Sequence, residues 1–252
     1  MTVRYEVVRR VAWLTIDRPA ARNALSAEVR RGLSEGFERF AGDGDAAVLV
    51  LTGTGDKAFC AGGDLREMAD TGLTVPPPDF VPQPGRTVQL TKPVVAAVNG
   101  IAYGGGFLLA QQCDLVLAAE HARFAVSEAK LGRGAPWAAP LSWLIPPRVA
   151  MQLLVTGDPI SAQRAHEVGL VNEVVPAARL HDAAQSLGER IAANAPLSVA
   201  AAKATVRLMA QPRFADAYAE AEALWEPVYL SADAQEGPVA YRDKRTPLWT
   251  GR

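Results

Sequence analysis

Residues 92–114 constrain the fold of this chain more than any other stretch. They begin with an apolar run at 93–98, which predicts a buried strand, and continue through an Asn99-Gly100 turn signal to three glycines, 104–106. The apolar residues after the glycines predict a buried helix. Glycine lets other groups approach the backbone, and the first N–H groups of a helix lack internal partners. The stretch therefore offers donors to an anion or to an oxygen that becomes one, although tight packing alone would also explain a bare glycine run.

A second glycine-containing turn lies earlier in the chain. Residues 47–52 predict a buried strand, and the sequence Ala61-Gly62-Gly63-Asp64 follows, ahead of a short charged helix. If the two turns converge, two backbone N–H groups can point at one carbonyl oxygen and form an oxyanion hole. Losing one donor from such a hole raises the barrier by about 3–4 kcal/mol. Such a hole needs an acid or base beside it. Glu128, which follows the predicted strand 123–126, is the best-placed candidate, and a structural carboxylate at a helix N-terminus is the alternative.

Composition excludes several classes of protein. The 252 residues suggest one large domain or two, and a formal net charge of −1 gives no reason to expect a nucleic-acid partner. No apolar run approaches the roughly 20 residues that span a membrane, and the N-terminus has no signal-peptide pattern, so we expect no membrane association and a cytoplasmic protein. Cys60 and Cys113 do not suggest a disulfide framework. The three histidines lack metal-ligand spacing, so no metal is expected.

The order of the predicted elements indicates an α/β core followed by a helical C-terminal part. Residues 74–85 are rich in proline and predict a surface loop, which we expect to form part of a lid over a pocket. After residue 138 the sequence predicts only helices and loops, apart from a short extended piece at 170–175. The predicted strands are 5–8, 11–16, 47–52, 93–98, 115–118 and 123–126, and the predicted helices include one capped by Ser26, one capped by Ser161, and 178–193, 197–209, 214–229 and 233–242.

Two motifs that would indicate other functions are rejected. Residues 32–36 match G-x-S-x-G, the nucleophile elbow of hydrolases, but they lie inside a charged helical pattern rather than between a strand and a helix. The glycines at 104–106 do not make G-x-G-x-x-G, and residues 53–57 lack the spacing of a P-loop. Neither hydrolysis by Ser34 nor nucleotide binding is therefore predicted.

Six motifs together resemble the crotonase family, the enoyl-CoA hydratase/isomerase superfamily. They are DRPAARNAL (17–25), AFCAGGDL (58–65), KPVVAAVNGIAYGGGF (92–107), CDLVLAAEHARFAVSEAKLG (113–132), TGDPISAQRAHEVGLVNEVVP (156–176) and SADAQEGPVAYRDKRTPLW (231–249). The resemblance implies a spiral of ββα units that carries the acyl-CoA site, over residues 1–195, and a C-terminal helical trimerisation region, over 196–252. It also implies a homotrimer or a hexamer.

The resemblance further implies the site residues. The backbone N–H groups of Gly63 and Gly105 would hold the thioester carbonyl oxygen of an acyl-CoA or enoyl-CoA substrate, and Glu128 would be the acid/base. Coenzyme A would enter as part of the substrate, and no separate cofactor is expected. Residues implied to bind substrate or coenzyme A are Ala21, Arg22, Ala61, Gly62, Asp64, Leu65, Gly104 and, from a neighbouring subunit, Lys244. The lysine usual in the first segment is Ala20 here, and Arg22 is its expected substitute.

Leu108 is the main departure from the family pattern. Family hydratases carry a second glutamate at this position, two residues after the glycine triplet. One remaining acid/base suits a double-bond shift better than hydration, so hydratase and isomerase both stay open, with a non-catalytic acyl-CoA-binding paralogue as the alternative. Residues 133–139 also depart, because Arg133, Pro136 and Trp137 replace a small, glycine-rich stretch. We expect these residues to reshape the acyl pocket and Arg133 to form a surface salt bridge, with a substrate carboxylate as its other candidate partner.

Overall fold

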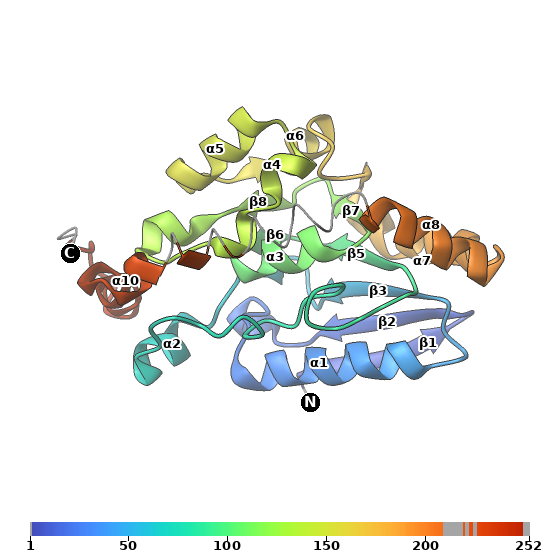
Figure 1. Ribbon diagram of the computed structural model, residues 1–252, viewed down its shortest axis with the longest axis horizontal. Coiled ribbons are helices and arrows are strands. Elements are labelled where there is room, and N and C mark those ends of the chain that lie inside the picture. Colours follow the sequence, from blue (N-terminus) through green and yellow to red (C-terminus); the bar gives the residue numbers. More distant parts are fainter. Residues whose placement is uncertain (1, 209–218, 220–221, 224–225, 249–252) are drawn as a thin grey trace.

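The computed structural model describes residues 2–208, 219, 222–223 and 226–248. It has two sheets, and the strands between residues 48 and 125 belong alternately to one and to the other (Figure 1). The larger sheet has the order β1(Val3–Val8), β2(Val11–Ile16), β3(Val48–Gly53), β5(Val94–Val98), β7(Leu115–Ala119), β10(Glu173–Val175). The smaller sheet has the order β4(Ala58–Cys60), β6(Ile101–Tyr103), β8(Arg123–Ala125), β9(Ile160–Ser161). Only the β1–β2 and β8–β9 pairs are antiparallel.

A strand–strand–helix unit occurs three times in succession. Strands β3 and β4 lead to α2(Leu65–Thr71), β5 and β6 lead to α3(Gly105–Gln112), and β7 and β8 lead to the 3₁₀ helix η2(Ser127–Leu131). In each unit the first strand joins the large sheet and the second joins the small sheet. The predicted α/β spiral of ββα units is therefore confirmed. Because corresponding strands are parallel neighbours, the three segments that follow β4, β6 and β8 emerge at one end of the small sheet.

Helices cover both faces of the large sheet. Along β3, Leu49 and Leu51 belong to a core shared with α1(Ala27–Gly42) and α3, whereas Val48 and Val50 belong to a second core closed by α7(Leu180–Ala192). This alternation is the period of two that a strand imposes on its side chains. Ser26 caps α1, as predicted, by accepting from the N–H of Val29 at 3.4 Å. The large sheet is therefore buried between two helical layers, and the glycine turns lie at the end of the small sheet, after β4 and β6.

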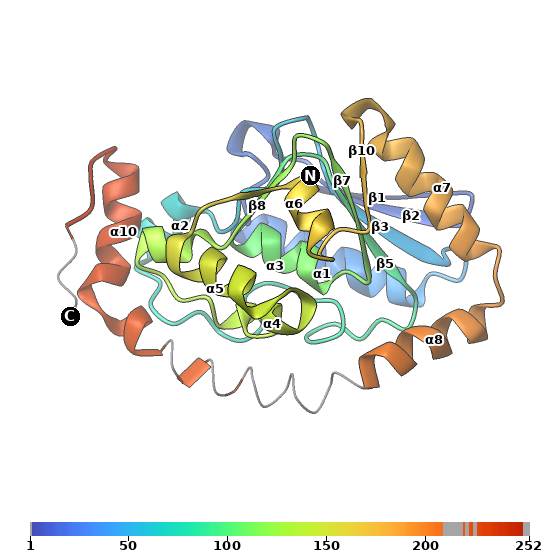
Figure 2. The ribbon, with the colours of Figure 1, turned by 90° about the horizontal axis from the view of Figure 1, so that it is seen from above.

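The C-terminal helices are spread over the molecule. α8(Pro196–Leu208) and α10(Ala232–Arg242) lie at opposite ends in both views, and α10 packs against α2 (Figures 1 and 2). The helix predicted at 214–229 lies largely outside the described residues. The boundary at residue 195 and the trimerisation role of 196–252 stay predictions. The remaining elements are α4(Leu141–Leu144), α5(Pro147–Thr156), α6(Ala162–Glu167), η1(Pro19–Ala21), η3(Pro136–Ala138) and η4(Ala177–Arg179).

Three short strands were not predicted. β4 lies between the predicted strand 47–52 and the first glycine turn, β6 lies between Asn99-Gly100 and the second, and β9 lies after residue 138, where only one extended piece was expected. All three owe their conformation to pairing with residues distant in sequence, which a local pattern does not show. Two other predictions agree with the structure. Residues 74–85, predicted as a loop, form no helix and no strand beyond an isolated bridge at Pro84, and Ser34 lies within the helix α1.

Two further predictions concern the cysteines and a membrane-spanning helix. Cys60 and Cys113 are both buried and free, so they form no disulfide. None of the described helices combines the length and the apolar character that crossing a bilayer requires.

Candidate active site

The two glycine turns converge. A β-carbon added to Gly105 would stand 3.8 Å from the backbone nitrogen of Gly63, and one added to Gly62 would stand 3.4 Å from the nitrogen of Gly105. The two nitrogens predicted to form the oxyanion hole therefore belong to backbone segments in direct contact. Gly105 is also the first residue of α3, so its N–H has no acceptor within the helix. That these two N–H groups together hold a carbonyl oxygen stays a prediction, and the contact between their segments agrees with it.

Glycine is required at the turn by conformation as well as by space. Gly62 has φ +97°, and a β-carbon there would stand 2.8 Å from the carbonyl oxygen of Tyr103. Gly104 has φ +51° and is the N-cap of α3. Residues that carry a side chain rarely adopt either backbone conformation. Close approach of α3 to the strand–turn that carries Gly63 thus depends on these glycines.

Glu128 lies in η2, beside the first turn of α3. Its Oε1 would be 3.2 Å from a β-carbon on Gly104, and it accepts a hydrogen bond from the indole Nε1 of Trp137 at 3.0 Å. Its Oε2 is buried and has no hydrogen-bond partner among the described residues. Burial raises the pKa of Glu128 to about 7, against the opposing effects of its own backbone N–H, the Trp137 indole and the Arg133 charge. A carboxyl group in this state can both give and take a proton near neutral pH.

Arg133 is buried, so the predicted surface salt bridge is wrong. Its guanidinium donates to the carbonyl oxygens of Leu73 and Thr74, both at 3.0 Å, and to that of Ala234 at 3.4 Å. Its carbon also lies 5.0 Å from the centre of the Tyr229 ring. These contacts join η2 to the start of the proline-rich loop and to α10. Buried arginine is uncommon, which is why the sequence did not reveal this role.

A cavity of about 400 Å³ lies beside Leu108 and Trp137, where the sequence predicts the acyl pocket. Leu108 is 3% exposed and presents an apolar wall where family hydratases carry a carboxylate. The prediction that residues 74–85 form part of a lid agrees with the lining. The residues around the cavity are Val75, Pro76, Pro77, Pro78, Phe80, Val81, Gln83, Arg86, Leu108, Pro136, Trp137, Glu222, Ala223, Glu226 and Tyr229.

The predicted coenzyme A segments lie next to each other. The backbone N–H of Ala61 donates to the carbonyl of Arg22 at 3.0 Å, so residues 21–22 border the oxyanion turn. The Asn23 side chain is fully buried and bonds the carbonyls of Thr54 and Ala58, which leaves it no contact with a ligand. Ala21, Ala61, Gly62 and Leu65 lie in or beside these turns, and their contact with substrate stays a prediction.

Asp64 and Lys244 differ in how available their side chains are. The Asp64 carboxylate caps α2 and pairs with Arg18, so these contacts stabilise the turn that carries Gly62 and Gly63. Lys244 is exposed, with φ +54°, just after α10. A contact of Lys244 with coenzyme A on a neighbouring subunit stays a prediction.

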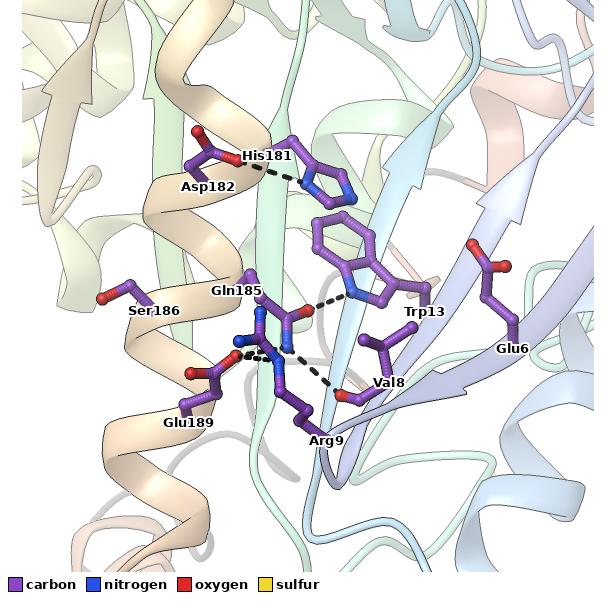
Figure 3. A pocket seen from close by; sticks show the side chains of 9 residues that line it. All are labelled: Glu6, Val8, Arg9, Trp13, His181, Asp182, Gln185, Ser186 and Glu189. Atoms are coloured by element: carbon purple, nitrogen blue, oxygen red, sulfur yellow. Dashed lines mark hydrogen bonds and ion pairs between the residues drawn. The ribbon is translucent and has the colours of Figure 1, made fainter.

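A second pocket, of about 260 Å³, lies between α7 and the β1–β2 hairpin (Figure 3). There the Trp13 ring stacks on His181 with centroids 4.2 Å apart, and its indole donates to Gln185 at 2.7 Å. The core closed by α7 includes Trp13 and none of the glycine-turn residues. This pocket is therefore separate from Glu128. Within the described residues no group of three or more His, Cys, Asp or Glu could hold a metal ion.

Comparison with known proteins agrees with this geometry. Residues 6–252 match the enoyl-CoA hydratase/isomerase family. A carnitinyl-CoA dehydratase of Salmonella paratyphi A is 39% identical over 249 residues, which cover 95% of this chain and 94% of the relative. A crystal structure of a carnitinyl-CoA hydratase from Mycobacterium avium superposes with a TM-score of 0.86 at 37% identity, covering 100% of this chain and 99% of the other. That of an enoyl-CoA hydratase from Mycobacterium tuberculosis H37Rv gives 0.82 at 33%, covering 92% and 100%.

These matches span nearly the whole chain, in the order in which the six motifs occur. The hydratases and dehydratases among the relatives support an acyl-CoA-processing enzyme of hydratase/lyase type. The resemblance seen in the sequence is confirmed: the chain belongs to the enoyl-CoA hydratase/isomerase family.

Proposed function

We propose that the protein adds water to, or removes it from, an acyl-CoA thioester, with Glu128 as the acid/base and the N–H groups of Gly63 and Gly105 as the oxyanion hole. The observation that carries this proposal is the meeting of the two glycine turns beside a carboxyl group that burial keeps near neutral pKa. The names of the hydratases and dehydratases to which the chain is similar support the same reaction class.

One carboxyl group is sufficient to balance the proton count. In the hydration direction, Glu128 takes a proton from water, the hydroxide oxygen bonds to C3, and the electron pair of the C2–C3 double bond moves toward the thioester. The two backbone N–H groups hold the resulting enolate oxygen. Glu128 then returns its proton to C2, so that one water molecule is added and the carboxylate is regenerated. Dehydration is the same sequence in reverse.

A double-bond shift is the second candidate, because Leu108 supplies an apolar wall beside the pocket. In that reaction Glu128 removes a proton from C2 of a 3-enoyl-CoA and delivers it to C4 of the same enolate. No water has to be held, so a second carboxylate is not needed. Both reactions use the same oxyanion hole. Hydration needs a water molecule held next to the substrate, near Leu108, and the double-bond shift does not.

The acyl pocket suits a cationic acyl group such as a carnitinyl group, which carries a quaternary ammonium. Trp137 lines it with an aromatic ring, and aromatic rings attract such cations, whereas the Phe80 and Tyr229 rings already stack with Arg30 and Arg133. Glu222, Glu226 and Arg86 also line the pocket, and Glu222 pairs with Arg86. We propose no cofactor besides the coenzyme A of the substrate, a homotrimer or hexamer with Lys244 near the coenzyme A of a neighbour, and a cytoplasmic location.

Paired turnover assays test this function. One offers a 2-enoyl-CoA, with and without a trimethylammonium group on C4, and follows loss of the ultraviolet absorbance of the conjugated double bond. The other offers a 3-enoyl-CoA and follows the gain of that absorbance. Loss in the first assay supports hydration, and preference for the cationic substrate supports the carnitinyl group. Gain in the second alone identifies an isomerase, whereas silence in both, with binding retained, supports the non-catalytic alternative.

A further inference from the structure

Trp137 is fixed at three points between the two parts of the site. Its indole Nε1 donates to Oε1 of Glu128 at 3.0 Å, and its backbone carbonyl accepts from the Gln111 side chain at 3.1 Å. Its ring packs edge-on against Phe107, with centroids 6.0 Å apart and planes at 66°. Phe107 and Gln111 both belong to α3, the helix that begins at Gly105. Trp137 therefore ties the helix of the oxyanion hole to the carboxyl group beside it.

The two oxygens of Glu128 are not equivalent. Oε1 has the Trp137 indole as its partner, whereas Oε2 is buried and lacks a partner among the described residues. A buried carboxylate oxygen without a hydrogen bond is costly to keep and is accordingly rare in folded proteins. An indole N–H can only donate, so it supports the ionised carboxylate and cannot exchange a proton with it in the reaction.

We infer that Trp137 is the positioning residue of this site: its indole holds Oε1 of Glu128 and leaves Oε2 as the oxygen that exchanges protons with the substrate. The inference rests on the proposed function of Glu128, but it concerns which residue orients the carboxyl group. It also assigns a role to the large ring that replaces the small residues expected after Glu128. The same ring lines the acyl pocket next to Leu108, so orientation and pocket shape depend on one side chain.

Other groups also influence Glu128. The charge of Arg133 favours the carboxylate, and Tyr229, which stacks with Arg133, also interacts electrostatically with Glu128. Neither of them makes a hydrogen bond to the carboxyl oxygens among the described residues. Removal of the indole N–H alone should therefore change the position and titration of Glu128 while Arg133 and Tyr229 stay in place.

The test compares Trp137→Phe with Trp143→Phe. The first removes the indole N–H and keeps an aromatic ring, and the second makes the same change at a tryptophan that is 48% exposed and outside the pocket lining. The carboxyl of Glu128 is titrated without substrate by infrared difference spectroscopy, with Glu128→Gln used to assign its band. We expect the midpoint to move to higher pH in Trp137→Phe and to stay unchanged in Trp143→Phe, because the lost donor favoured the ionised form.

Kinetics with the substrate found by the paired assays provides the second readout. We expect kcat of Trp137→Phe to fall about 10- to 100-fold, the range that loss of a hydrogen bond to a charged group gives, with a much smaller change in KM. An unchanged infrared midpoint together with an unchanged kcat, even at lowered thermal stability, would overturn the inference. If the wild type is inactive on every substrate, the proposed function fails, and the infrared midpoint still decides whether Trp137 orients Glu128.

Discussion

The carboxyl group of Glu128 lies directly against the backbone of Gly104, because a β-carbon on Gly104 would stand only 3.2 Å from Oε1. Gly105, the next residue, begins α3 and carries one of the two proposed oxyanion donors. A thioester whose oxygen is held there would therefore have its α-carbon near the carboxyl group. This proximity is what makes an enolate mechanism with a single acid/base geometrically feasible.

Substitution at Gly62 should disrupt the oxyanion hole. Gly62→Ala adds a β-carbon 2.8 Å from the Tyr103 carbonyl at φ +97°, so the turn has to shift. We expect kcat/KM to fall about 10²–10³-fold, the effect of losing one donor. Gly72→Ala is the matched control, because Gly72 also has positive φ, +59°, but meets nothing within 4 Å. Equal losses of activity in both variants would show that the donor geometry does not depend on Gly62.

A carboxylate at position 108 should favour hydration. Leu108→Glu places a second acid/base at the pocket wall, where it can hold water, and we expect the ratio of hydration to isomerisation to rise by about 10-fold or more. Leu108→Gln has a similar shape and cannot exchange a proton, so it should leave the ratio near that of the wild type. Both variants should melt at lower temperature, because residue 108 is 3% exposed. If the ratio of hydration to isomerisation is the same in Leu108→Glu and Leu108→Gln, a carboxylate at position 108 does not favour hydration, and the prediction is wrong.

The raised pKa of Glu128 should appear in the pH dependence of stability. Between the ordinary value of 4.5 and the folded value of about 7, the folded chain keeps the proton that the unfolded chain releases. Stability therefore decreases as pH rises through this window, by about 3 kcal/mol in all, and the loss is complete above it. Glu128→Gln has no such titration, so its stability relative to the wild type should increase between pH 5 and pH 8 in urea denaturation.

The matched control for this measurement is Glu120→Gln, because Glu120 is exposed. Its effect on stability should differ much less between the two pH values. A stability difference between Glu128→Gln and the wild type that does not depend on pH would mean that burial does not perturb this carboxyl group.

Arg133 should hold the lid and α10 in place. Arg133→Met removes the donors to three backbone carbonyls, and we expect it to lower the free energy of unfolding by about 1.5–3 kcal/mol or more. Residues 74–85 should then be cleaved faster in limited proteolysis. Arg148→Met, at an exposed position, should change stability by no more than about 0.5 kcal/mol. Unchanged cleavage in Arg133→Met would show that the lid is held by other contacts.

The sequence predicted the parts of the site that depend on local pattern. The glycine turns and Glu128 could be singled out because glycine runs and the order strand, turn, helix are visible along the chain, and the family resemblance then supplied their expected roles. The contact between Trp137 and Glu128 could not, since no local rule says that a ring nine residues away folds back onto a carboxyl group. Arg133 was assigned to the surface because charged residues are usually exposed. Strands β4, β6 and β9 were missed because two or three residues are too few to show a period.

The most direct test of the account compares turnover and binding in Glu128→Gln. Turnover is measured with the substrate on which the wild type is active, and binding of the same coenzyme A ester is measured by calorimetry. We predict that turnover falls by about 10²–10⁴-fold, the contribution of a positioned acid/base, while the dissociation constant changes little. Unchanged turnover, with binding intact, would contradict the assignment of Glu128 and with it the proposed mechanism.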